Sequence, residues 1–370
     1  MSHQICSRCI MDTTDPKITF DADGVCSHCH SYDAVEKTWP LKTYLAEDKI
    51  SQVLEKVKTS KSGQYDSIVG LSGGVDSSYV AYLAHQHGLN PLCVHLDNGW
   101  NSELAVSNIH NIVKKLNFDL HTHVIDWNEF RSLQRAFFKA HVVDIEVLSD
   151  HAIFAVIINL AKKHNIKYVL SGANFATEAV MPKSWVHRKQ DLKNIRHINK
   201  LYGELPMKTF PQASTLRHVL LMYGLGYKVM KPLNYIDYNK KEAMQLLKDK
   251  FDWRPYGGKH YESLFTKFYQ AHILPNKFNI DKRKAHLSTL VLSKQMTREE
   301  ALEELSKPLY DPEELEQDKA YVLKKLGLTP EWFEDYMKAP PRSHYEFKSD
   351  EKTFQFLALI RDRFFGASVS

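Results

Sequence analysis

The sequence predicts an α/β fold in which helices cover both faces of a parallel sheet, preceded by a small metal-binding module and followed by a helical region. Three observations support this prediction. Four apolar runs alternate with helical patterns between residues 65 and 171, the first run ends in a glycine-rich loop, and four cysteines lie within the first 29 residues. Strands that alternate with helices are typical of right-handed crossovers, which make a sheet parallel.

The first element is a pair of Cys-x-x-Cys motifs, Cys6 with Cys9 and Cys26 with Cys29, separated by sixteen residues. Each motif brings two sulfurs to one ion, and four thiolates satisfy the tetrahedral geometry of Zn²⁺. Because four cysteine ligands leave no open position, we expect a structural zinc site. The fifth cysteine, Cys93, lies in an apolar run and is expected to be a buried strand residue.

The alternating segment begins with a helical spacing of apolar residues at 44–58. Strand-like apolar runs and helical spacing then take turns along the chain. We expect strands at residues 65–71, 91–97, 120–126 and 167–171, and helices at residues 75–87, 102–116 and 150–163. In such sheets ligands bind beyond the carboxyl ends of the strands. The loops that follow the four strands are therefore expected to share one site.

The carboxy-terminal part of the chain has a different pattern. Beyond about residue 240 the strand signal fades, and helical spacing takes over at residues 298–306, 313–326 and 353–365. We therefore expect three units. They are a four-cysteine zinc-binding module at residues 1–40, an α/β domain at residues 41–240, and a mainly helical region at residues 241–370 that completes the substrate site.

Composition and charge restrict the class of protein. The chain has 370 residues, of which 43% are hydrophobic and 25% charged, and its apolar runs are too short to span a bilayer. We expect a cytoplasmic protein without membrane contact. Residues 181–200 hold six basic residues and one acid, which accounts for the whole net charge of +5. This stretch suits a phosphate-bearing small molecule better than nucleic acid, with a solvated loop as the alternative.

The glycine-rich loop at residues 72–78 carries the most specific chemistry. It joins an apolar strand to a helix, so the glycines let the backbone approach an anion and the helix amino terminus supplies free N–H groups. Asp76 can hold a Mg²⁺ ion that bridges phosphate oxygens. Since no Walker lysine follows, transfer of the terminal phosphate is not expected. The residues expected to bind the phosphates of ATP are Ser72, Gly73, Gly74, Asp76, Ser77 and Ser78.

A strand followed by S-G-G-x-D-S resembles the PP-loop ATP pyrophosphatases, which include NAD, asparagine and GMP synthetases and tRNA thiolases. The resemblance implies a Rossmann-like fold of the adenine nucleotide α-hydrolase type and cleavage of ATP between its α and β phosphates. A substrate oxygen is adenylated and then displaced by ammonia or sulfur. The resemblance also implies that Leu96 and Asp97, at the end of the second strand, face the adenine and ribose.

Cysteine usage and several distinctive strings narrow the choice within this superfamily. Thiolases need further cysteines, yet only Cys93 lies outside the zinc module, and Ser2 stands where a fused glutaminase of the asparagine synthetases has its cysteine. The whole chain resembles the N-acetyl sugar amidotransferases of the WbpG and PseA type. The strings that carry this resemblance are I-C-S-R-C-I-M-D-T-T-D-P at 5–16, D-G-V-C-S-H-C at 23–29, S-G-A-N-F-A-T-E at 171–178, G-G-K-H-Y-E-S at 257–263 and L-P-N-K-F-N-I-D-K-R-K-A-H-L-S at 274–288.

This resemblance implies that the acetamido group of a nucleotide-activated sugar becomes an acetamidino group, in the synthesis of bacterial O-antigen lipopolysaccharide or flagellin glycans. AMP is transferred to the amide oxygen, and ammonia then attacks the carbon. We expect Lys259, Lys282 and Arg283 to stabilise the departing pyrophosphate. Each of them is alternatively a surface basic residue.

Two residues beyond the fourth predicted strand, Asn174 and Glu178, are expected to lie where the substrate meets the adenylate. Glu178 would accept a proton from ammonia or bind a sugar hydroxyl. A capping or turn role is the alternative for both. In the basic stretch, Arg188 and Lys189 are expected to hold the diphosphate of the sugar nucleotide, with Trp185 either stacked on a base or packed in the interior.

The resemblance also implies partners. Ammonia would come from a separate glutaminase like that of histidine biosynthesis, either alone or with a cyclase companion that carries the ammonia. The expected small molecules are ATP, Mg²⁺, Zn²⁺ and a nucleotide sugar, and we do not expect nucleic acid. Two alternatives stay open. One is a tRNA-modifying thiolase or related adenylating enzyme whose zinc module touches RNA, and the other is a nucleotide-binding scaffold without catalysis.

Overall fold

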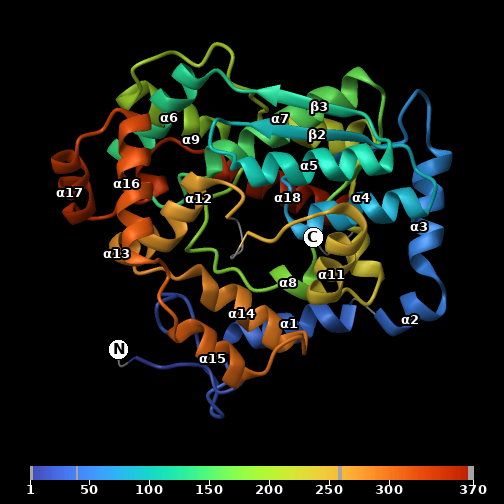
Figure 1. Ribbon diagram of the computed structural model, residues 1–370, viewed down its shortest axis with the longest axis horizontal. Coiled ribbons are helices and arrows are strands. Elements are labelled where there is room, and N and C mark those ends of the chain that lie inside the picture. Colours follow the sequence, from blue (N-terminus) through green and yellow to red (C-terminus); the bar gives the residue numbers. More distant parts are fainter. Residues whose placement is uncertain (1–2, 39–40, 257–260, 366–370) are drawn as a thin grey trace.

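A five-stranded sheet forms the centre of the molecule (Figure 1). The computed structural model describes residues 3–38, 41–256 and 261–365. Its strands are β1 (Ser67–Gly70), β2 (Leu92–Asp97), β3 (Leu120–Val124), β4 (Tyr168–Leu170) and β5 (Lys228–Met230). All neighbours pair in parallel in the order β3-β2-β1-β4-β5, which confirms the predicted parallel sheet. The chain moves to one side of β1 for β2 and β3 and to the other side for β4 and β5, which places a topological switch point between β1 and β4.

Both faces of the sheet are covered, as the continuous apolar runs predicted. Ile68 and Val69 are successive residues of β1 and point to opposite faces. Ile68 packs in a cluster with Val156 of α7, whereas Val69 packs with Val80 of α4 and Ile109 of α5. The helices of the α4 face are α3 (Lys49–Thr59), α4 (Val75–Gln86), α5 (Glu103–Leu116) and α11 (Lys240–Phe251), and α7 (Val147–Lys163) covers the other face.

The remaining helices lie before, between and after these elements. Early in the chain are α1 (Ser27–Thr38) and α2 (Leu41–Ala46), followed between strands by α6 (Trp127–Ala140), α8 (Phe175–Glu178), α9 (Leu192–Tyr202), α10 (Thr215–Val219), the π-helix η1 (Leu220–Gly224) and the 3-10 helix η2 (Pro232–Tyr235). The carboxy-terminal part is helical, as predicted. It contains α12 (Leu264–Phe268), η3 (Tyr269–Ile273), α13 (Leu274–Phe278), α14 (Lys282–Leu292), α15 (Arg298–Ser306), α16 (Pro312–Leu326), α17 (Pro330–Lys338), η4 (His344–Glu346) and α18 (Glu351–Phe365).

The sequence missed two elements and one break. Helix α6 follows β3 with a strongly amphipathic pattern that the strand-centred analysis did not use, and β5 is a three-residue edge strand. The helix expected at residues 44–58 is two helices, because the chain turns at Asp48, whose φ of 46° is left-handed. None of the described helices is long and apolar enough to cross a bilayer.

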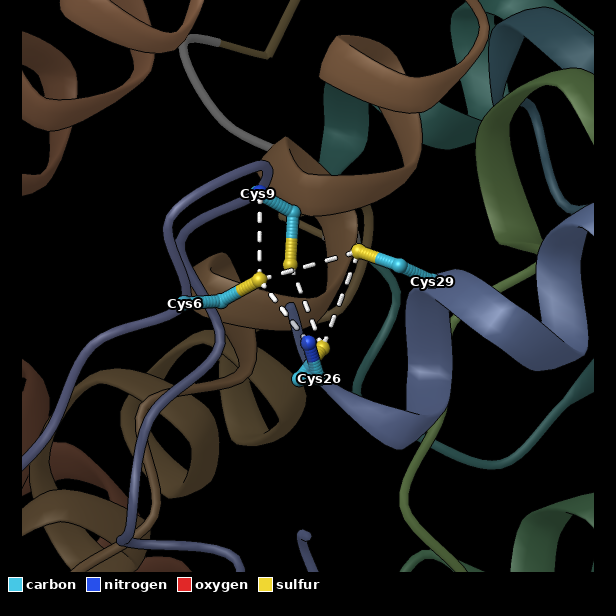
Figure 2. A group of neighbouring side chains, drawn as sticks. All are labelled: Cys6, Cys9, Cys26 and Cys29. Carbon is cyan, nitrogen blue, oxygen red and sulfur yellow. Dashed lines mark hydrogen bonds between the residues drawn. The ribbon is translucent and has the colours of Figure 1, made fainter. Parts of the chain in front are cut away.

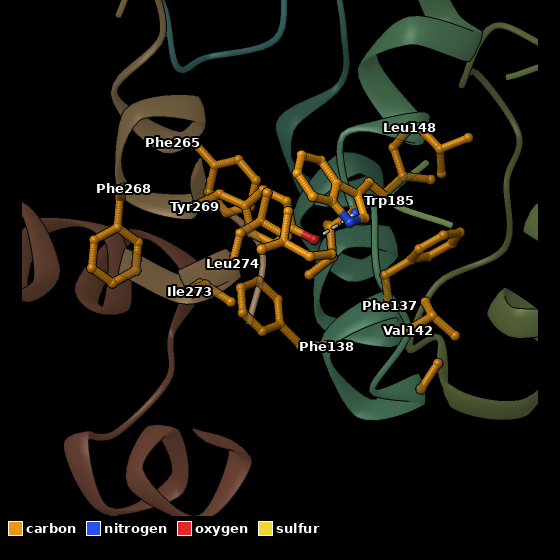
Figure 3. Close-up of a cluster of buried hydrophobic side chains, with 14 of the residues drawn as sticks. Phe137, Phe138, Val142, Leu148, Trp185, Phe265, Phe268, Tyr269, Ile273 and Leu274 are labelled. Atoms are coloured by element: carbon orange, nitrogen blue, oxygen red, sulfur yellow. Dashed lines mark hydrogen bonds between the residues drawn. The ribbon is translucent and has the colours of Figure 1, made fainter. Parts of the chain in front are cut away.

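A large apolar cluster joins the sheet domain to the carboxy-terminal helices (Figure 3). Phe138 of α6 contacts Tyr336 of α17 with a ring-centroid distance of 4.9 Å, and Trp185 is 1% exposed in the same cluster. Tyr269 is fully buried, and its hydroxyl accepts a hydrogen bond from the backbone N–H of Asp144 at 2.7 Å. Of the two roles considered for Trp185, the structure shows interior packing rather than an exposed stacking surface.

Candidate active site

The glycine-rich loop connects β1 to α4 and needs both of its glycines. Gly73 has a φ of +88°, and a Cβ there would lie 2.7 Å from the Tyr256 hydroxyl and 2.9 Å from the Ala105 carbonyl oxygen. A Cβ on Gly74 would collide with the carboxylate of Glu262. The loop is therefore enclosed by side chains from distant segments, and only glycine fits between them.

Two side chains from the segment after α11 hold the Gly73 carbonyl. Its oxygen accepts hydrogen bonds from the Trp253 indole N–H at 2.8 Å and from the Tyr256 hydroxyl at 2.9 Å. Asn108 of α5 donates to the same Tyr256 hydroxyl at 2.9 Å. These bonds fix the loop while the first turn of α4, whose backbone N–H groups have no intrahelical acceptors, borders a cavity.

This cavity, which we call the phosphate cavity, has a volume of about 460 Å³. Its charged lining is three carboxylates and one amine, from Asp76, Glu178, Glu262 and Lys240. The other lining residues are Ser72, Gly74, Val75, Ser77, Gly172, Ala173, Met244, Trp253, Pro255 and Tyr256. A triphosphate beside three carboxylates requires divalent cations, and carboxylate oxygens are ligands that Mg²⁺ prefers. The donor set therefore fits Mg²⁺ together with a polyphosphate.

Asp76 is held by a buried tyrosine. The Tyr238 hydroxyl donates to Asp76 Oδ1 at 2.5 Å, and Tyr238 is 4% exposed. Burial and the nearby Asp76 carboxylate raise the pKa of Tyr238 far above its usual value, so its proton stays in place to donate. This bond orients the carboxylate at the first turn of α4.

Gln295, which lies just after α14, links three elements around the same cavity. Its amide nitrogen donates to the Ala176 carbonyl of α8 at 3.4 Å and to the Tyr238 carbonyl at 3.2 Å. Its amide oxygen accepts from the backbone N–H of Lys240 at 3.0 Å. The carboxy-terminal region therefore fixes the segments that carry Glu178, Tyr238 and Lys240.

A second cavity, about 380 Å³ in volume, lies on the α7 side of the loop and is called the β2 cavity here. It shares Ser72 and Glu262 with the phosphate cavity. Its remaining lining residues are Gly70, Leu71, His95, Leu96, Asn98, Asn101, Glu146, Ser149, Asp150, Ile153, Lys189, Ser263, Thr266, Gln270 and Lys282. Three acids and two lysines make this lining close to neutral, which suits a nucleoside or sugar better than a diphosphate.

The lysines of the β2 cavity are paired within its wall. Lys282 lies 3.0 Å from the Glu146 carboxylate, and Lys189 lies 2.7 Å from Asp144 and 2.9 Å from Asp150. Asp144 is buried, which alone would raise its pKa, but Lys189 and Lys282 outweigh the burial and hold that pKa below its usual value. These cations neutralise the protein's own carboxylates.

The structure distributes the predicted phosphate and pyrophosphate residues unevenly. Ser72, Gly74, Asp76 and Ser77 line the phosphate cavity, and Glu178 joins them there. Ser78 is fully buried and lines neither cavity. Lys282 lines the β2 cavity, whereas Arg283 lines neither, because it binds Asp281 and backbone carbonyls of residues 304–307. Lys259 lies outside the described residues.

The other predicted binding residues also divide. Leu96 lines the β2 cavity, but Asp97 lines neither cavity, and its Oδ1 accepts from the backbone N–H of Gly99 at 2.9 Å. Asn174 is 4% exposed and caps α8, with its Oδ1 accepting from the Thr177 N–H at 2.9 Å. Asn174 thus has the capping role that the sequence left as the alternative.

The basic stretch is a correction to the sequence analysis. Arg188 pairs with Asp350, and with Glu351 at 2.9 Å, both near the start of α18. Lys189 is held by two aspartates, as described above. Because carboxylates of this chain already neutralise these two cations, the prediction that they hold a sugar-nucleotide diphosphate is wrong.

The four amino-terminal cysteines converge on one point (Figure 2). Their sulfurs are separated by 3.7 Å between Cys6 and Cys29, 3.6 Å between Cys9 and Cys26, and 3.7 Å between Cys26 and Cys29. Four sulfurs at about 2.3 Å from a tetrahedral zinc ion lie roughly 3.8 Å apart. All four residues are fully buried, so the cluster fits a closed zinc site.

The cysteine module packs on the carboxy-terminal helices (Figure 1). Arg298, which begins α15, donates to the carbonyls of Cys9 at 3.0 Å and Cys6 at 2.9 Å. Lys284 of α14 lies 2.6 Å from Asp12. The two ends of the chain are therefore joined beside α14, the helix that precedes Gln295.

Sequence reasoning missed most residues that enclose the loop. Lys240, Trp253 and Tyr256 were not singled out, and Glu262 was quoted only within a resemblance string. These residues lie more than 160 positions after the loop and follow no local motif. The only signal available was the density of aromatic and charged residues at 253–262.

Comparisons with known proteins match two separate parts of the chain. A family model described as NAD synthase matches residues 46–200, which contain β1 to β4 and the glycine-rich loop. A second model, described as LPS biosynthesis protein WbpG-like, C-terminal domain, matches residues 262–361. The second match covers Glu262, Lys282 and Gln295, which line or support the cavities.

Curated relatives match only the sheet region. The glutamine-hydrolysing GMP synthase of Thermotoga petrophila is 30% identical over 147 residues, which are 38% of this chain and 27% of that protein. An uncharacterised protein of Methanocaldococcus jannaschii is 28% identical over 117 residues, 31% of this chain and 40% of that one. The chain thus spans about a quarter of the length of the GMP synthase.

Solved structures include two with the same TM-score of 0.30. The NH3-dependent NAD synthetase from Campylobacter jejuni is 16% identical and covers 55% of this chain and 82% of its own. The NMN synthetase from Francisella tularensis is 18% identical and covers 57% of this chain and 87% of its own.

Proposed function

Because the chain is a WbpG-type member of the PP-loop ATP pyrophosphatase family, we propose that it transfers AMP from ATP to the acetamido oxygen of a nucleotide-activated sugar. Ammonia then replaces that oxygen, and the products are an acetamidino sugar, AMP and pyrophosphate. Adenylation is needed because an amide carbonyl is a poor electrophile, whereas AMP is a good leaving group.

The observation that carries this proposal is the composition of the phosphate cavity. The loop and the start of α4 supply N–H and hydroxyl donors for phosphate, and Asp76 with Glu178 provides carboxylates for Mg²⁺. When bound, Mg²⁺ would neutralise the charge that develops on the phosphate oxygens. Lys240, at the start of α11, stabilises the departing pyrophosphate, the role that the sequence analysis gave to other cations.

The nature of the acceptor rests on the second cavity. Residues of the WbpG-like region line it together with Leu96 of β2. Its near-neutral lining accommodates adenosine and the acetamido end of the sugar rather than a second polyphosphate. A diphosphate of the sugar nucleotide would remain outside these two cavities.

Ammonia is the proposed second reagent. Sulfur transfer by a thiolase requires an accessible thiol, but Cys93 is fully buried and its burial raises its pKa to about 12. The other four cysteines form the buried cluster. We place the reaction in the cytoplasm, in lipopolysaccharide O-antigen or flagellin-glycan synthesis, with ammonia from a separate glutaminase like that of histidine biosynthesis, alone or with a cyclase companion.

The test is an assay of AMP and pyrophosphate with ATP, Mg²⁺ and ammonium chloride. A panel of UDP- and CMP-linked acetamido sugars and bulk tRNA would be supplied as acceptors. We expect release that depends on one acetamido sugar, with the sugar product carrying an imino group in place of oxygen. Turnover only with tRNA and a sulfur donor would overturn the proposal, and ATP binding without turnover on any acceptor would indicate a scaffold.

A further inference from the structure

Glu262 occupies a position that no other charged residue shares among those lining the two cavities. It lines both the phosphate cavity and the β2 cavity, and Ser72 is the other residue common to both. Glu178 lines the phosphate cavity and Glu146 the β2 cavity, each without reaching the other. A carboxylate at this junction lies between the part of the site for phosphates and the part for the acceptor.

The backbone of Glu262 is fixed to the loop after β2. Its carbonyl accepts from the Ser102 N–H at 2.9 Å, and Leu264 N–H donates to the Trp100 carbonyl at 3.0 Å. Ser263 forms an antiparallel bridge with Asn101 and caps α12. Bonds on both sides of Glu262 therefore set the direction of its side chain.

The Glu262 carboxylate lies over the glycine-rich loop. A Cβ on Gly74 would collide with Glu262 Oε1, so the loop has room for this carboxylate only because Gly74 lacks a side chain. Gly74 is the N-cap of α4, directly before the helix whose amino terminus faces the phosphates. The carboxylate is thus close to where the phosphorus nearest the β2 cavity, the α-phosphorus, would lie.

Resting on the proposed function, we propose that Glu262 is the catalytic base of the ammonia step. Ammonia forms a C–N bond to the carbon of the O-adenylyl imidate, and Glu262 accepts a proton from the added nitrogen. The C–O bond to AMP breaks, and AMP leaves with the electron pair. Glu262 passes its proton to the sugar-side nitrogen, so that the amidine product leaves as a cation and the carboxylate is restored.

This assignment separates two glutamates that sequence reasoning did not distinguish. Glu178, to which the sequence analysis gave the ammonia proton, lies only on the phosphate side, beside Asp76. Glu262 lies where an acceptor bound in the β2 cavity would meet the α-phosphate. The roles therefore predict different failures, since loss of Glu178 affects adenylation and loss of Glu262 affects capture of ammonia.

The test compares Glu262→Gln with the matched variant Glu178→Gln in the full chain, with ATP, Mg²⁺, ammonium chloride and the acetamido sugar nucleotide that supports wild-type turnover. Pyrophosphate and amidine are measured together. We expect Glu262→Gln to release pyrophosphate near the wild-type rate while the adenylate is hydrolysed, so amidine per pyrophosphate falls about 100-fold or more. Glu178→Gln should lower pyrophosphate release and leave that ratio unchanged.

Two results would overturn the inference. One is an unchanged ratio of amidine to pyrophosphate in Glu262→Gln. The other is loss of pyrophosphate release with a raised Mg²⁺ requirement, which would make Glu262 a metal ligand. If the glutamine variant does not fold, Glu262→Asp withdraws the carboxylate by one methylene and should give an intermediate ratio, and a wild-type ratio would contradict the proposal. A wild type inactive on every acetamido sugar would instead refute the proposed function.

Discussion

The phosphate cavity and the basic segment at residues 181–200 both concentrate charged side chains, but the charges differ in what they face. In the cavity, three carboxylates and Lys240 border open volume. In the segment, Arg188 meets Asp350 and Glu351, and Lys189 meets two aspartates. The difference teaches that charge along a sequence indicates ligand binding only where the fold leaves the charge facing a space.

The physical reason is the cost of removing charge from water. A buried cation must be neutralised by the protein or by a ligand, and a cation that already has protein partners gains little from a ligand. Arg188 is largely buried and also packs over the Phe354 ring. It therefore fastens α18 to the sheet domain, whereas Lys240 remains at a cavity wall.

The largest expected effect is that of Asp76→Asn, which tests the cavity side of the comparison. Removing this carboxylate eliminates a ligand for Mg²⁺, so pyrophosphate release should fall roughly 1,000-fold. The thermal unfolding midpoint should change little, because Asn can still accept from the Tyr238 hydroxyl. Retained release would mean that the metal is held elsewhere.

Lys240→Met should have the next largest effect. Loss of the only described lysine or arginine in the phosphate cavity removes charge stabilisation of pyrophosphate, and release should slow about 100-fold. Stopped-flow measurement of pyrophosphate with saturating ATP isolates this step. Unchanged release by a folded variant would assign the role to another cation.

Arg188→Met tests the other side. The variant leaves two partly buried carboxylates without their partner, and the free energy of unfolding should fall by about 2–3 kcal/mol. Denaturant unfolding measures this loss, while pyrophosphate release per folded molecule should match the wild type. A normal stability with weakened binding of the sugar nucleotide would restore the role predicted from the sequence.

Gln295→Leu should have a smaller effect that reaches both stability and turnover. Its three hydrogen-bond partners lose a side-chain bond, which should lower the free energy of unfolding by about 1–2 kcal/mol. Because these partners carry Lys240 and Tyr238, pyrophosphate release should also slow. Denaturant unfolding and the release assay on the same preparation check both, and a purely thermodynamic effect would show that Gln295 supports the fold alone.

Much of the fold and part of the site could be predicted from the sequence. Strand β1, the loop and α4 follow one another along the chain, so hydrophobic periodicity and glycine placement were sufficient to locate them. The cysteine pairs likewise carry their spacing in the sequence. Each of these features depends on short-range geometry.

The rest depends on partners that the sequence does not pair. Arg283 and Lys240 are both basic residues near helix starts, yet one binds Asp281 and backbone carbonyls and the other lines the cavity. Nothing local distinguishes them, because the difference comes from the packing of distant segments. The same holds for Trp253 and Tyr256, whose bonds to the Gly73 carbonyl exist only in the folded chain.

Isotope transfer from the acetamido oxygen tests the central claim most directly. An acetamido sugar nucleotide labelled with ¹⁸O in the acetamido carbonyl would be turned over with ATP, Mg²⁺ and ammonia, and the AMP examined by mass spectrometry. Since adenylation joins that oxygen to phosphorus before ammonia displaces it, the account predicts that the label appears in AMP. Unlabelled AMP formed alongside amidine would contradict the account.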